Sequence, residues 1–499
     1  MKSIHEVEKN RRKYHKYKDK NTVQRSSLTV PNFDFCDASI SFLNHFLIKR
    51  GYKKIACKVS AVDSLGDFVD SITIQIDKPI VYILNLKKLF EESNKKINYF
   101  IIEFFSQNNL FIPFPAVMIN HNNNNFCNMV HSYNRILNDI FEDDKNSMNV
   151  PESSFEKFID KKHDTFFNFS TGIYDFQGKI KIIFENSKKK ILAPINIKLN
   201  RLNNKSFYFS EILKKYNNLN DGYIKILQPK QNMFYSRMLA GIINKEKKSF
   251  SANHTFYDSS ELKEYFKSKK STKTYPFFDG FLNKIIMYPL MSKGAFKIII
   301  KIFNKKKIIH FNEYLFNSKN KKTLEININE IVKNNNLKII DSFSVEAISK
   351  IFKIPTRVNH QLIYGSLNHN NKLNCSINVS LNNEKIYIPT NKKGFRWGQI
   401  ICGTKYESRL GITPSIVKKQ DLKKQTLKIN IYDESGKIKS YKKNISPFES
   451  IKIDLNTLLE IKDDFKVLWY SIESELSNIG AYSFHINKKT QFSSGEHAF

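Results

Sequence analysis

Apolar residues alternate with polar ones in many short stretches of this chain, and these stretches recur at a nearly constant spacing. One block, with the pattern apolar, any, apolar, any, any, apolar, apolar, occurs four times, and its copies begin at Leu84, Phe207, Ile326 and Ile453. The differences between these positions are 123, 119 and 127 residues. Self-similarity at a fixed period is the signature of a protein built from one repeated unit.

The flanks of the block keep the same period. An alternating strand precedes each copy, and these strands begin at Lys54, Lys179, Phe296 and Leu427. Another apolar strand follows each copy, and these begin at Tyr99, Tyr223, Lys338 and Lys466. Short strands with turn signals between them are typical of an antiparallel sandwich. We therefore predict a mainly β protein, a tandem array of about four β-sandwich-like (immunoglobulin-like) units with long inter-unit segments.

The pattern also suggests boundaries. The block itself has both an extended reading and one in which a strand runs into a single helical turn. No flexible Pro/Gly/Ser-rich linker separates the units, so we expect them to pack on one another. The expected divisions are a basic disordered arm at 1–27, unit 1 with a short N-terminal helix at 28–133, unit 2 at 134–257, unit 3 at 258–364, and unit 4 with a leading non-repeated segment at 365–499.

The net charge of +34 over 499 residues raises the possibility of a polyanion partner. Most of the basic residues are Lys. Arg, whose planar guanidinium binds phosphate better, is scarce. The chain is also rich in Asn and Ile, a composition that an AT-rich genome writes into any protein. We therefore expect only non-specific, low-salt binding to nucleic acid.

The termini and the cysteines bear on the compartment. The first twenty residues are charged throughout and contain no apolar core of a signal peptide, and no apolar run is long enough for a membrane helix, so no membrane insertion is expected. The five cysteines are scattered and include no CxxC, which argues against a disulfide framework and a cysteine zinc site. We expect free thiols and a cytoplasmic protein.

Catalytic fingerprints are missing from the sequence. It contains no GxGxxG, GxxxxGK[ST], GxSxG or HExxH motif. The sequence therefore implies no nucleotide cofactor and no metal, and it does not decide whether the protein is an enzyme. It also leaves the oligomeric state open.

Three of the four units end on a shared signature of Phe, a small residue or Cys, then His with an aromatic two positions later. The signature histidines are His131, His254 and His497, and the third unit instead carries His360 in a different context. Such a histidine could ligate a metal or act as a base if the copies converge. The alternative, which we favour, is that each one bonds a backbone carbonyl and closes its own strand.

Two segments hold candidate site residues. The non-repeated stretch from Phe395 to Thr413 contains an aromatic ring (Trp397), two guanidinium groups (Arg396 and Arg409) and a carboxylate (Glu407). Together these groups suit a sugar or a sugar acid. The alternative is that Trp397 is core and Arg409 pairs with Glu407. The second segment surrounds Pro113 and Pro115 and contributes the secondary candidates His121, Tyr133 and Arg135.

The function that we expect is that of a non-catalytic repeat protein that binds a glycan or another polyhydroxyl or acidic ligand, with polysaccharide metabolism as a setting. Two alternatives stay open. One is a carbohydrate-active enzyme that uses His and carboxylates from the inter-unit segments, and the other is a polyanion-binding protein. A cleft in which ionisable side chains converge would favour the enzyme, and a contiguous Lys/Arg face would favour the polyanion binder.

Overall fold

The computed structural model divides the chain into two compact units, an N-terminal unit over Met1–Tyr257 and a C-terminal unit over Asp258–Phe499. Each is described by itself. The residues that the structure describes are 24–107, 116–131, 153–157, 162–186, 188–214, 216, 222–228, 237–246, 248–255, 265–266, 268–288, 295–305, 307–317, 323–351, 353–355, 357–368, 373–383, 393–417, 421–475 and 478–499.

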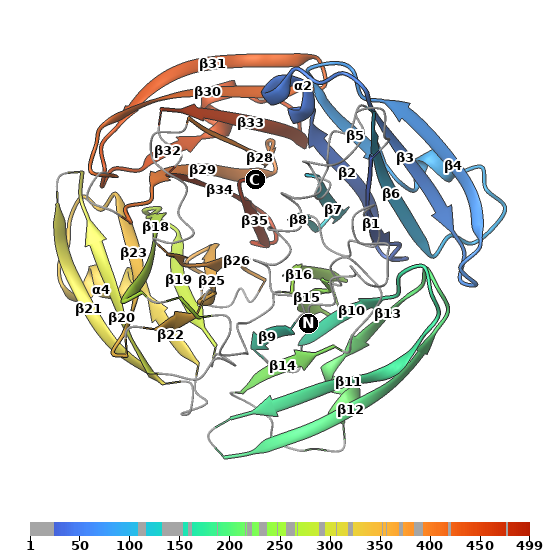
Figure 1. Ribbon diagram of the computed structural model, residues 1–499, viewed down its shortest axis with the longest axis horizontal. Coiled ribbons are helices and arrows are strands. Elements are labelled where there is room, and N and C mark those ends of the chain that lie inside the picture. Colours follow the sequence, from blue (N-terminus) through green and yellow to red (C-terminus); the bar gives the residue numbers. More distant parts are fainter. Residues whose placement is uncertain are drawn as a thin grey trace. The chain divides into compact units, whose positions relative to one another are not determined.

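The N-terminal unit holds two β-sandwiches, which we call repeats 1 and 2 (Figure 1). The strands of repeat 1 are β1 (Gln24–Pro31), β2 (Asp37–Leu43), β3 (Ile55–Val62), β4 (Phe68–Gln75), β5 (Val81–Asn85), β6 (Tyr99–Ser106), β7 (Met118–Asn123) and β8 (Phe126–His131), with the helices α2 (His45–Arg50) and η1 (Lys88–Phe90). Those of repeat 2 are β9 (Ser153–Lys157), β10 (His163–Ser170), β11 (Phe176–Glu185), β12 (Lys190–Leu199), β13 (Asn204–Tyr208), β14 (Tyr223–Leu227), β15 (Leu239–Asn244) and β16 (Ser249–His254), with α3 (Phe209–Ile212).

The C-terminal unit holds repeats 3 and 4. Repeat 3 contains β17 (Tyr265–Phe266), β18 (Lys270–Pro276), β19 (Leu282–Met287), β20 (Ala295–Phe303), β21 (Ile308–Asn317), β22 (Leu324–Asn327), β23 (Ser342–Ser349), β24 (Ile354–Pro355), β25 (Asn359–Gly365), β26 (Cys375–Ser380) and β27 (Asn382–Asn383), with α4 (Ile328–Asn334). Repeat 4 contains β28 (Gly394–Cys402), β29 (Tyr406–Pro414), β30 (Gln425–Asp433), β31 (Gly436–Ile445), β32 (Ile451–Asp454), β33 (Lys466–Ser474), β34 (Ile479–Asn487) and β35 (Ser493–His497), with α5 (Leu455–Leu459).

All four repeats share one antiparallel topology. In repeat 1 the outer sheet has the strand order β1-β6-β3-β4 and the inner sheet the order β5-β2-β7-β8. The corresponding orders are β9-β14-β11-β12 with β13-β10-β15-β16, β18-β23-β20-β21 with β22-β19-β25-β26, and β28-β33-β30-β31 with β32-β29-β34-β35. The short strand β27 adds to the edge of β18 in repeat 3. The predicted fold class, a mainly β tandem array of four sandwich-like units, is confirmed.

The repeated sequence block occupies one place in every repeat. It forms the fifth strand of the sandwich and the helical turn that follows: β5 with η1, β13 with α3, β22 with α4, and β32 with α5. In repeats 3 and 4 the helix start is capped by the side chains of Asn327 and Asp454, which accept bonds from backbone N–H groups of the first turn. Both readings of the block are therefore realised, one after the other.

Some expected boundaries differ from the structure. Residues 24–27, assigned to a disordered arm, lie in β1, and the rest of that arm falls outside the described residues. The helix expected in unit 1 is present as α2, but β2 occupies the residues before it. The expected boundary at 364/365 falls inside repeat 3, because β26 pairs with β25 and β27 with β18. β26 and β27 pair with strands that lie earlier in the chain. A strand of this kind is hard to assign to its repeat from the sequence alone, because the sequence does not show its partner.

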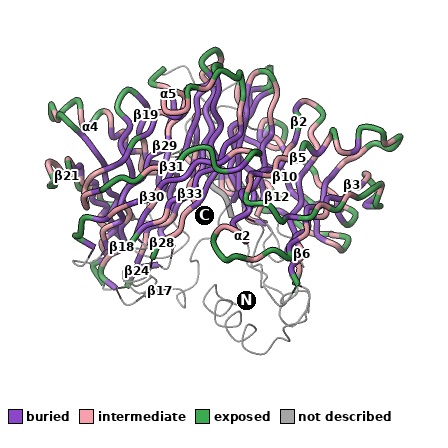
Figure 2. Tube along the Cα trace, turned by 90° about the horizontal axis from the view of Figure 1, so that it is seen from above, coloured by how far each residue is buried: buried purple, intermediate pink, exposed green. Residues whose placement is uncertain are grey.

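The two sheets of each sandwich differ in burial (Figure 2). Edge strands of the outer sheets, such as β4 and β31, alternate or expose most of their side chains. Inner strands such as β8, β16 and β25 are buried at every position. A strand that is buried on both faces shows no alternation of apolar and polar residues, so an alternation search finds the outer sheet and misses much of the inner one.

Aromatic rings join the two repeats within each unit. In the N-terminal unit the ring of Phe250 on β16 lies 5.1 Å from Phe126 and 5.3 Å from Phe166, centroid to centroid. In the C-terminal unit Phe484 on β34 of repeat 4 lies 4.9 Å from Phe278 and 5.1 Å from Tyr364, both in repeat 3. These edge, tilted and stacked contacts bury large apolar areas, so the two repeats of a unit share a core.

The five cysteines Cys36, Cys57, Cys127, Cys375 and Cys402 are buried and free, as the sequence predicted. Burial raises the pKa of the Cys36 and Cys402 thiols to about 12. No helix in the described part of the chain is long and apolar enough to cross a membrane.

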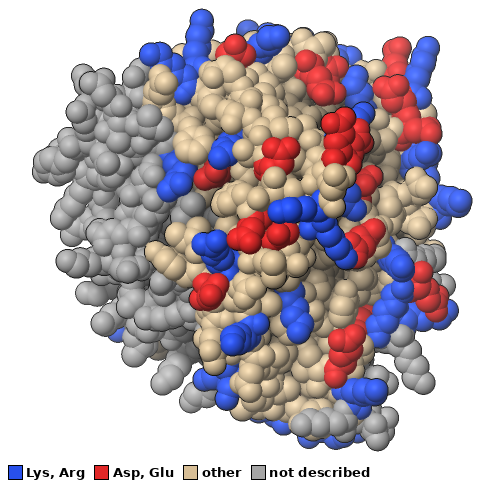
Figure 3. Space-filling model, turned by 90° about the vertical axis from the view of Figure 1, so that its right-hand side faces the viewer, with Lys and Arg blue, Asp and Glu red and all other residues tan. Residues whose placement is uncertain are grey.

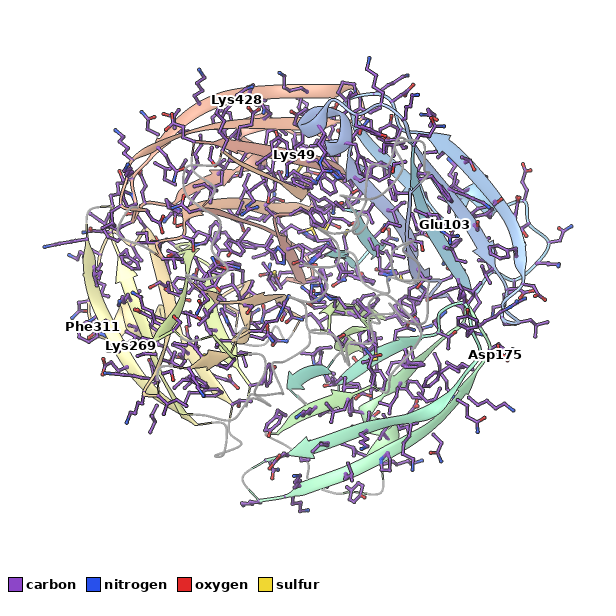
Figure 4. The ribbon with its side chains drawn as sticks, viewed as in Figure 1. Lys49, Glu103, Asp175, Lys269, Phe311 and Lys428 are labelled. Carbon is purple, nitrogen blue, oxygen red and sulfur yellow. The ribbon has the colours of Figure 1, made fainter. Side chains whose placement is uncertain are left out.

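We predict that Phe250→Ala lowers the free energy of unfolding by about 3–5 kcal/mol, because it removes a fully buried ring that both repeats of the N-terminal unit contact. The matched control is Phe311→Ala on the edge strand β21, where the ring is 59% exposed (Figure 4). That change should shift stability by no more than about 0.5 kcal/mol. Denaturant unfolding measures both, and equal effects of the two variants would contradict a shared core at Phe250.

Candidate functional site

A cavity of 360 Å³ lies between repeats 3 and 4 of the C-terminal unit. Repeat 3 contributes β18 and the β26–β27 end, and repeat 4 contributes β28, β34 and the end of β35. The lining residues are Lys273, Thr274, Leu381, Asn382, Asn383, Arg396, Ser415, Asn478, Ile479, Gly480, Ala481, Tyr482, His497 and Ala498. Cavities of this size hold small ligands rather than polymers.

The shared aromatic core fixes the walls of this cavity. Tyr275 on β18 packs edge-on against Tyr482 on β34, with ring centroids 5.4 Å apart. The chain also approaches closely at β35, since a Cβ on Gly495 would lie 2.5 Å from the Ser483 carbonyl oxygen and 2.6 Å from Cys375 Sγ. Only glycine fits there, and the two repeats are held at a set separation in consequence.

Two cationic side chains face the cavity, and no carboxylate is among its described lining residues. Lys273 is partly buried and forms no ion pair with a described residue. Burial, with smaller contributions from the charges of Arg396 and Arg357, lowers the pKa of Lys273 to about 8. Arg396 donates its Nε–H to the carbonyl oxygen of Ile479 at 3.0 Å, which fixes its side chain along the wall. Positive charge in a recess whose described lining holds no carboxylate attracts an anion.

Amide side chains line the remainder of the cavity and are themselves fixed by hydrogen bonds. Asn382 Nδ2 donates to Ser415 Oγ at 3.3 Å, and Asn383 Nδ2 donates to Ser271 Oγ at 3.2 Å. Asn478 accepts at its Oδ1 from Gln425 Nε2 at 3.3 Å and donates to the Ser415 carbonyl at 3.3 Å. Side chains held in this way can offer hydrogen bonds to a polyhydroxyl ligand without being reordered.

The structure separates the four residues that the sequence grouped around Trp397. Arg396 lines the cavity, whereas the ring of Trp397 is buried and stacks on Phe499 at 5.7 Å. Glu407 and Arg409 lie on β29, outside the described lining. Ser408, between those two residues, donates its hydroxyl to the Ile401 carbonyl, near the opposite end of β28 from Arg396. The alternative interpretation, a core tryptophan with a separate ion pair, describes these contacts.

Arg409 forms an ion cluster within repeat 4 and also contacts repeat 3. Its Nη2 lies 2.7 Å from Glu407 Oε1, and its Nη1 lies 3.0 Å from Asp454 Oδ2. The guanidinium also sits 5.0 Å from the ring centroid of Phe281 in repeat 3. All of these contacts are made by the Arg409 guanidinium, so protein groups already occupy it.

Two of the secondary candidates are buried neutral histidines. Burial, followed by the charge of Lys87, lowers the pKa of His121 to about 3, and its ring packs against Phe33 and Phe250. Burial, followed by the charge of Lys273, lowers the pKa of His360 to about 3. His360 Nε2 accepts from the Tyr275 hydroxyl at 2.6 Å. Both rings contribute to packing between strands.

The repeat-end histidines end the eighth strands β8, β16 and β35. The Nδ1 atoms of His254 and His497 lie 2.7 and 2.9 Å from the carbonyl oxygens of Thr255 and Ala498. This is the backbone contact that the strand-closing interpretation expects. In the N-terminal unit, however, the rings of His131 and His254 also approach each other, at 4.5 Å between centroids. Tyr133 and Arg135 lie outside the described residues.

Sequence reasoning missed most of the cavity. Lys273, Asn383 and Asn478 belong to three different strands or loops. Lys273 alone carries a local signal: it follows the buried residues Ser271 and Thr272, and a cation among buried residues of a strand needs a reason. Arg396 was found because its segment shares no sequence pattern with the other repeats, although the structure gives its strand β28 the counterparts β1, β9 and β18.

The surface bears on the polyanion alternative. On the face that Figure 3 shows, Lys and Arg side chains are interspersed with Asp and Glu. Several Lys side chains pair with carboxylates, as in Lys428 with Glu473 at 3.2 Å and Lys405 with Asp464 at 2.8 Å. A mixed face of this kind does not form the contiguous basic track that nucleic acid requires.

We predict that Arg409→Ala lowers the free energy of unfolding by roughly 1–2 kcal/mol, because it removes two partly exposed ion pairs and a contact with Phe281. Binding of ligands in the cavity should not change. Thermal unfolding and calorimetric titration measure the two effects separately. A loss of ligand affinity at an unchanged melting temperature would restore Arg409 to the binding site.

No family model matches this sequence, and no curated protein matches it either. Among solved structures, a crystal structure of chicken CNTN1 FN1–FN3 domains aligns with 70% of this chain and 98% of its own chain, at 10% sequence identity. The TM-score of that alignment is 0.10, so the likeness carries no argument about function.

Proposed function

We propose that this protein binds an acidic polyhydroxyl ligand, such as a sugar acid, in the cavity between repeats 3 and 4. The observation that carries the proposal is the pairing of Lys273 and Arg396 in one recess whose described lining contains no carboxylate. A carboxylate of the ligand could accept hydrogen bonds from both cations, and charge-assisted hydrogen bonds of this kind are stronger than those between neutral groups.

The rest of the lining suits the body of a sugar. The amides of Asn382, Asn383 and Asn478 and the hydroxyl of Ser415 can exchange hydrogen bonds with ligand hydroxyls. Ile479, Ala481 and Ala498 offer an apolar surface for C–H groups. A mixture of a few fixed polar groups with apolar walls is typical of small-molecule sites.

Binding fits this lining better than the enzyme alternative does. A carbohydrate-active enzyme commonly places two carboxylates beside the scissile bond, whereas the described lining holds no carboxylate and supplies Lys273, Tyr482 and His497 as groups that could exchange a proton. Burial raises the pKa of the Tyr482 hydroxyl above its ordinary range, so it is a poor base near neutral pH. We therefore propose a non-catalytic binding role.

We predict that gluconate and galacturonate bind to the full chain, that glucose and galactose bind more weakly, and that Lys273→Met and Arg396→Gln each weaken binding of the acids about 10- to 100-fold. That range corresponds to the loss of one charge-assisted hydrogen bond. The matched control is Lys270→Met on the same strand, whose ammonium instead pairs with Glu346 at 3.3 Å. Calorimetric titration gives the affinities, and circular dichroism checks folding.

Two outcomes of this titration would overturn the proposal. Equal affinity for the acids and the neutral sugars would remove the role of the cations. Unchanged affinity of folded Lys273→Met and Arg396→Gln would place any bound acid elsewhere.

Affinity for the acids should also depend on pH in one direction. Lys273 is protonated below a pKa of about 8 and loses its charge as pH rises through that value. Gluconate stays an anion throughout, so its affinity should be constant well below this pKa and fall as pH rises through it. The decline should be absent in Lys273→Met. An affinity that rises with pH over this range would contradict the assignment of Lys273.

A further inference from the structure

The signature histidines of repeats 1 and 2 converge inside the N-terminal unit. His131 is the last residue of β8, and His254 is the last residue of β16, the equivalent strand of the next repeat. Each offers a ring nitrogen within 4.8 Å of one offered by the other, and the two rings meet edge to face. Closing a strand end requires only a bond from each histidine to its own backbone and does not require the two rings to meet.

Contacts between the two strands fix this approach. Asn128 Oδ1 on β8 accepts a hydrogen bond from the backbone N–H of Ala252 on β16, at 2.8 Å. Both strands are buried along their whole lengths, and the two histidines are only 6% and 4% exposed. The pair is therefore held rigidly and is shielded from bulk water, two properties that favour a defined coordination geometry.

The orientation of His254 is the one that metal-binding histidines commonly have. Its Nδ1 lies 2.7 Å from the Thr255 carbonyl oxygen, so Nδ1 carries the proton and the Nε2 lone pair points the other way. A metal-ligating imidazole almost always donates its second ring N–H to a carbonyl or a carboxylate in this way, which fixes the tautomer and raises the basicity of the ligating nitrogen.

We propose that His131 and His254 are two ligands of a divalent transition-metal ion. Imidazole nitrogens without thiolate suit Zn²⁺, Cu²⁺, Ni²⁺ and Co²⁺, and they do not suit Ca²⁺ or Mg²⁺, which take oxygen ligands. Further ligands complete the coordination shell. The two proposals rest on different residues, His131 and His254 for the metal and Lys273 and Arg396 for the anion.

The test is titration of the full chain, stripped with a chelator, with Co²⁺ and with Zn²⁺. We expect one tightly bound ion per chain, a visible Co²⁺ absorption band, and a higher melting temperature in its presence, because an ion that binds only the folded state stabilises it. X-ray absorption at the metal edge counts the bound imidazoles, and we expect at least two.

The variants His131→Ala and His254→Ala should each weaken Co²⁺ binding by more than the 10- to about 100-fold loss that follows removal of an outer-shell partner. The matched control is His310→Ala on the edge strand β21, where the ring bonds to Asn312 nearby. If an alanine variant fails to fold, His131→Asn and His254→Asn replace it, and the metal-dependent rise in melting temperature must then be lost.

Three results would overturn the proposal. The first is that the parent protein binds no stoichiometric Co²⁺. The second is that the parent and both folded histidine variants bind Co²⁺ equally well. The third is an X-ray absorption spectrum that shows fewer than two imidazoles bound to the metal. Failure here leaves the anion site standing, since gluconate binding is measured separately.

Discussion

The structure depends on burying both faces of the inner sheet in every repeat. A sandwich alone covers one face of each sheet, and the second face of the inner sheet then needs another partner. In each unit the neighbouring repeat covers part of that face: β16 lies against β8 and β35 against β26, through bonds such as Asn128 with Ala252 and Cys375 with Ser493. Without its neighbour, a repeat would therefore expose part of its inner sheet. The cavity around Lys273 and the pair His131 and His254 both lie between neighbouring repeats of a unit.

This constraint explains the polar residues in the core. Inner strands such as β8 and β16 carry buried Asn, Ser and His beside buried aromatic and aliphatic residues. Buried polar groups must find hydrogen-bond partners, and strand-to-strand contacts between repeats supply them. A cavity such as the one around Lys273 remains where the two repeats do not close completely. In the N-terminal unit, repeats 1 and 2 pack closely at the pair His131 and His254.

The sequence predicted the fold well because many of the repeated strands alternate buried positions with less buried ones. Strand β30 of the outer sheet and strand β32 at the edge of the inner sheet show this pattern. Strands β10 and β18 were read as irregular segments, since they contain Ser, Thr or Asn at buried positions. The site was predicted less well. Arg396 was identified from a segment whose sequence pattern differs from the other repeats, but Lys273 meets it only through packing between repeats, which no local pattern encodes.

A crystal structure of the full chain with galacturonate bound would test directly whether Lys273 and Arg396 bind a sugar acid. We expect ligand density in the cavity between repeats 3 and 4, with the carboxylate within hydrogen-bond distance of Lys273 Nζ and the Arg396 guanidinium. Density for the acid at any other place, with this cavity holding only water at a saturating concentration, would contradict it.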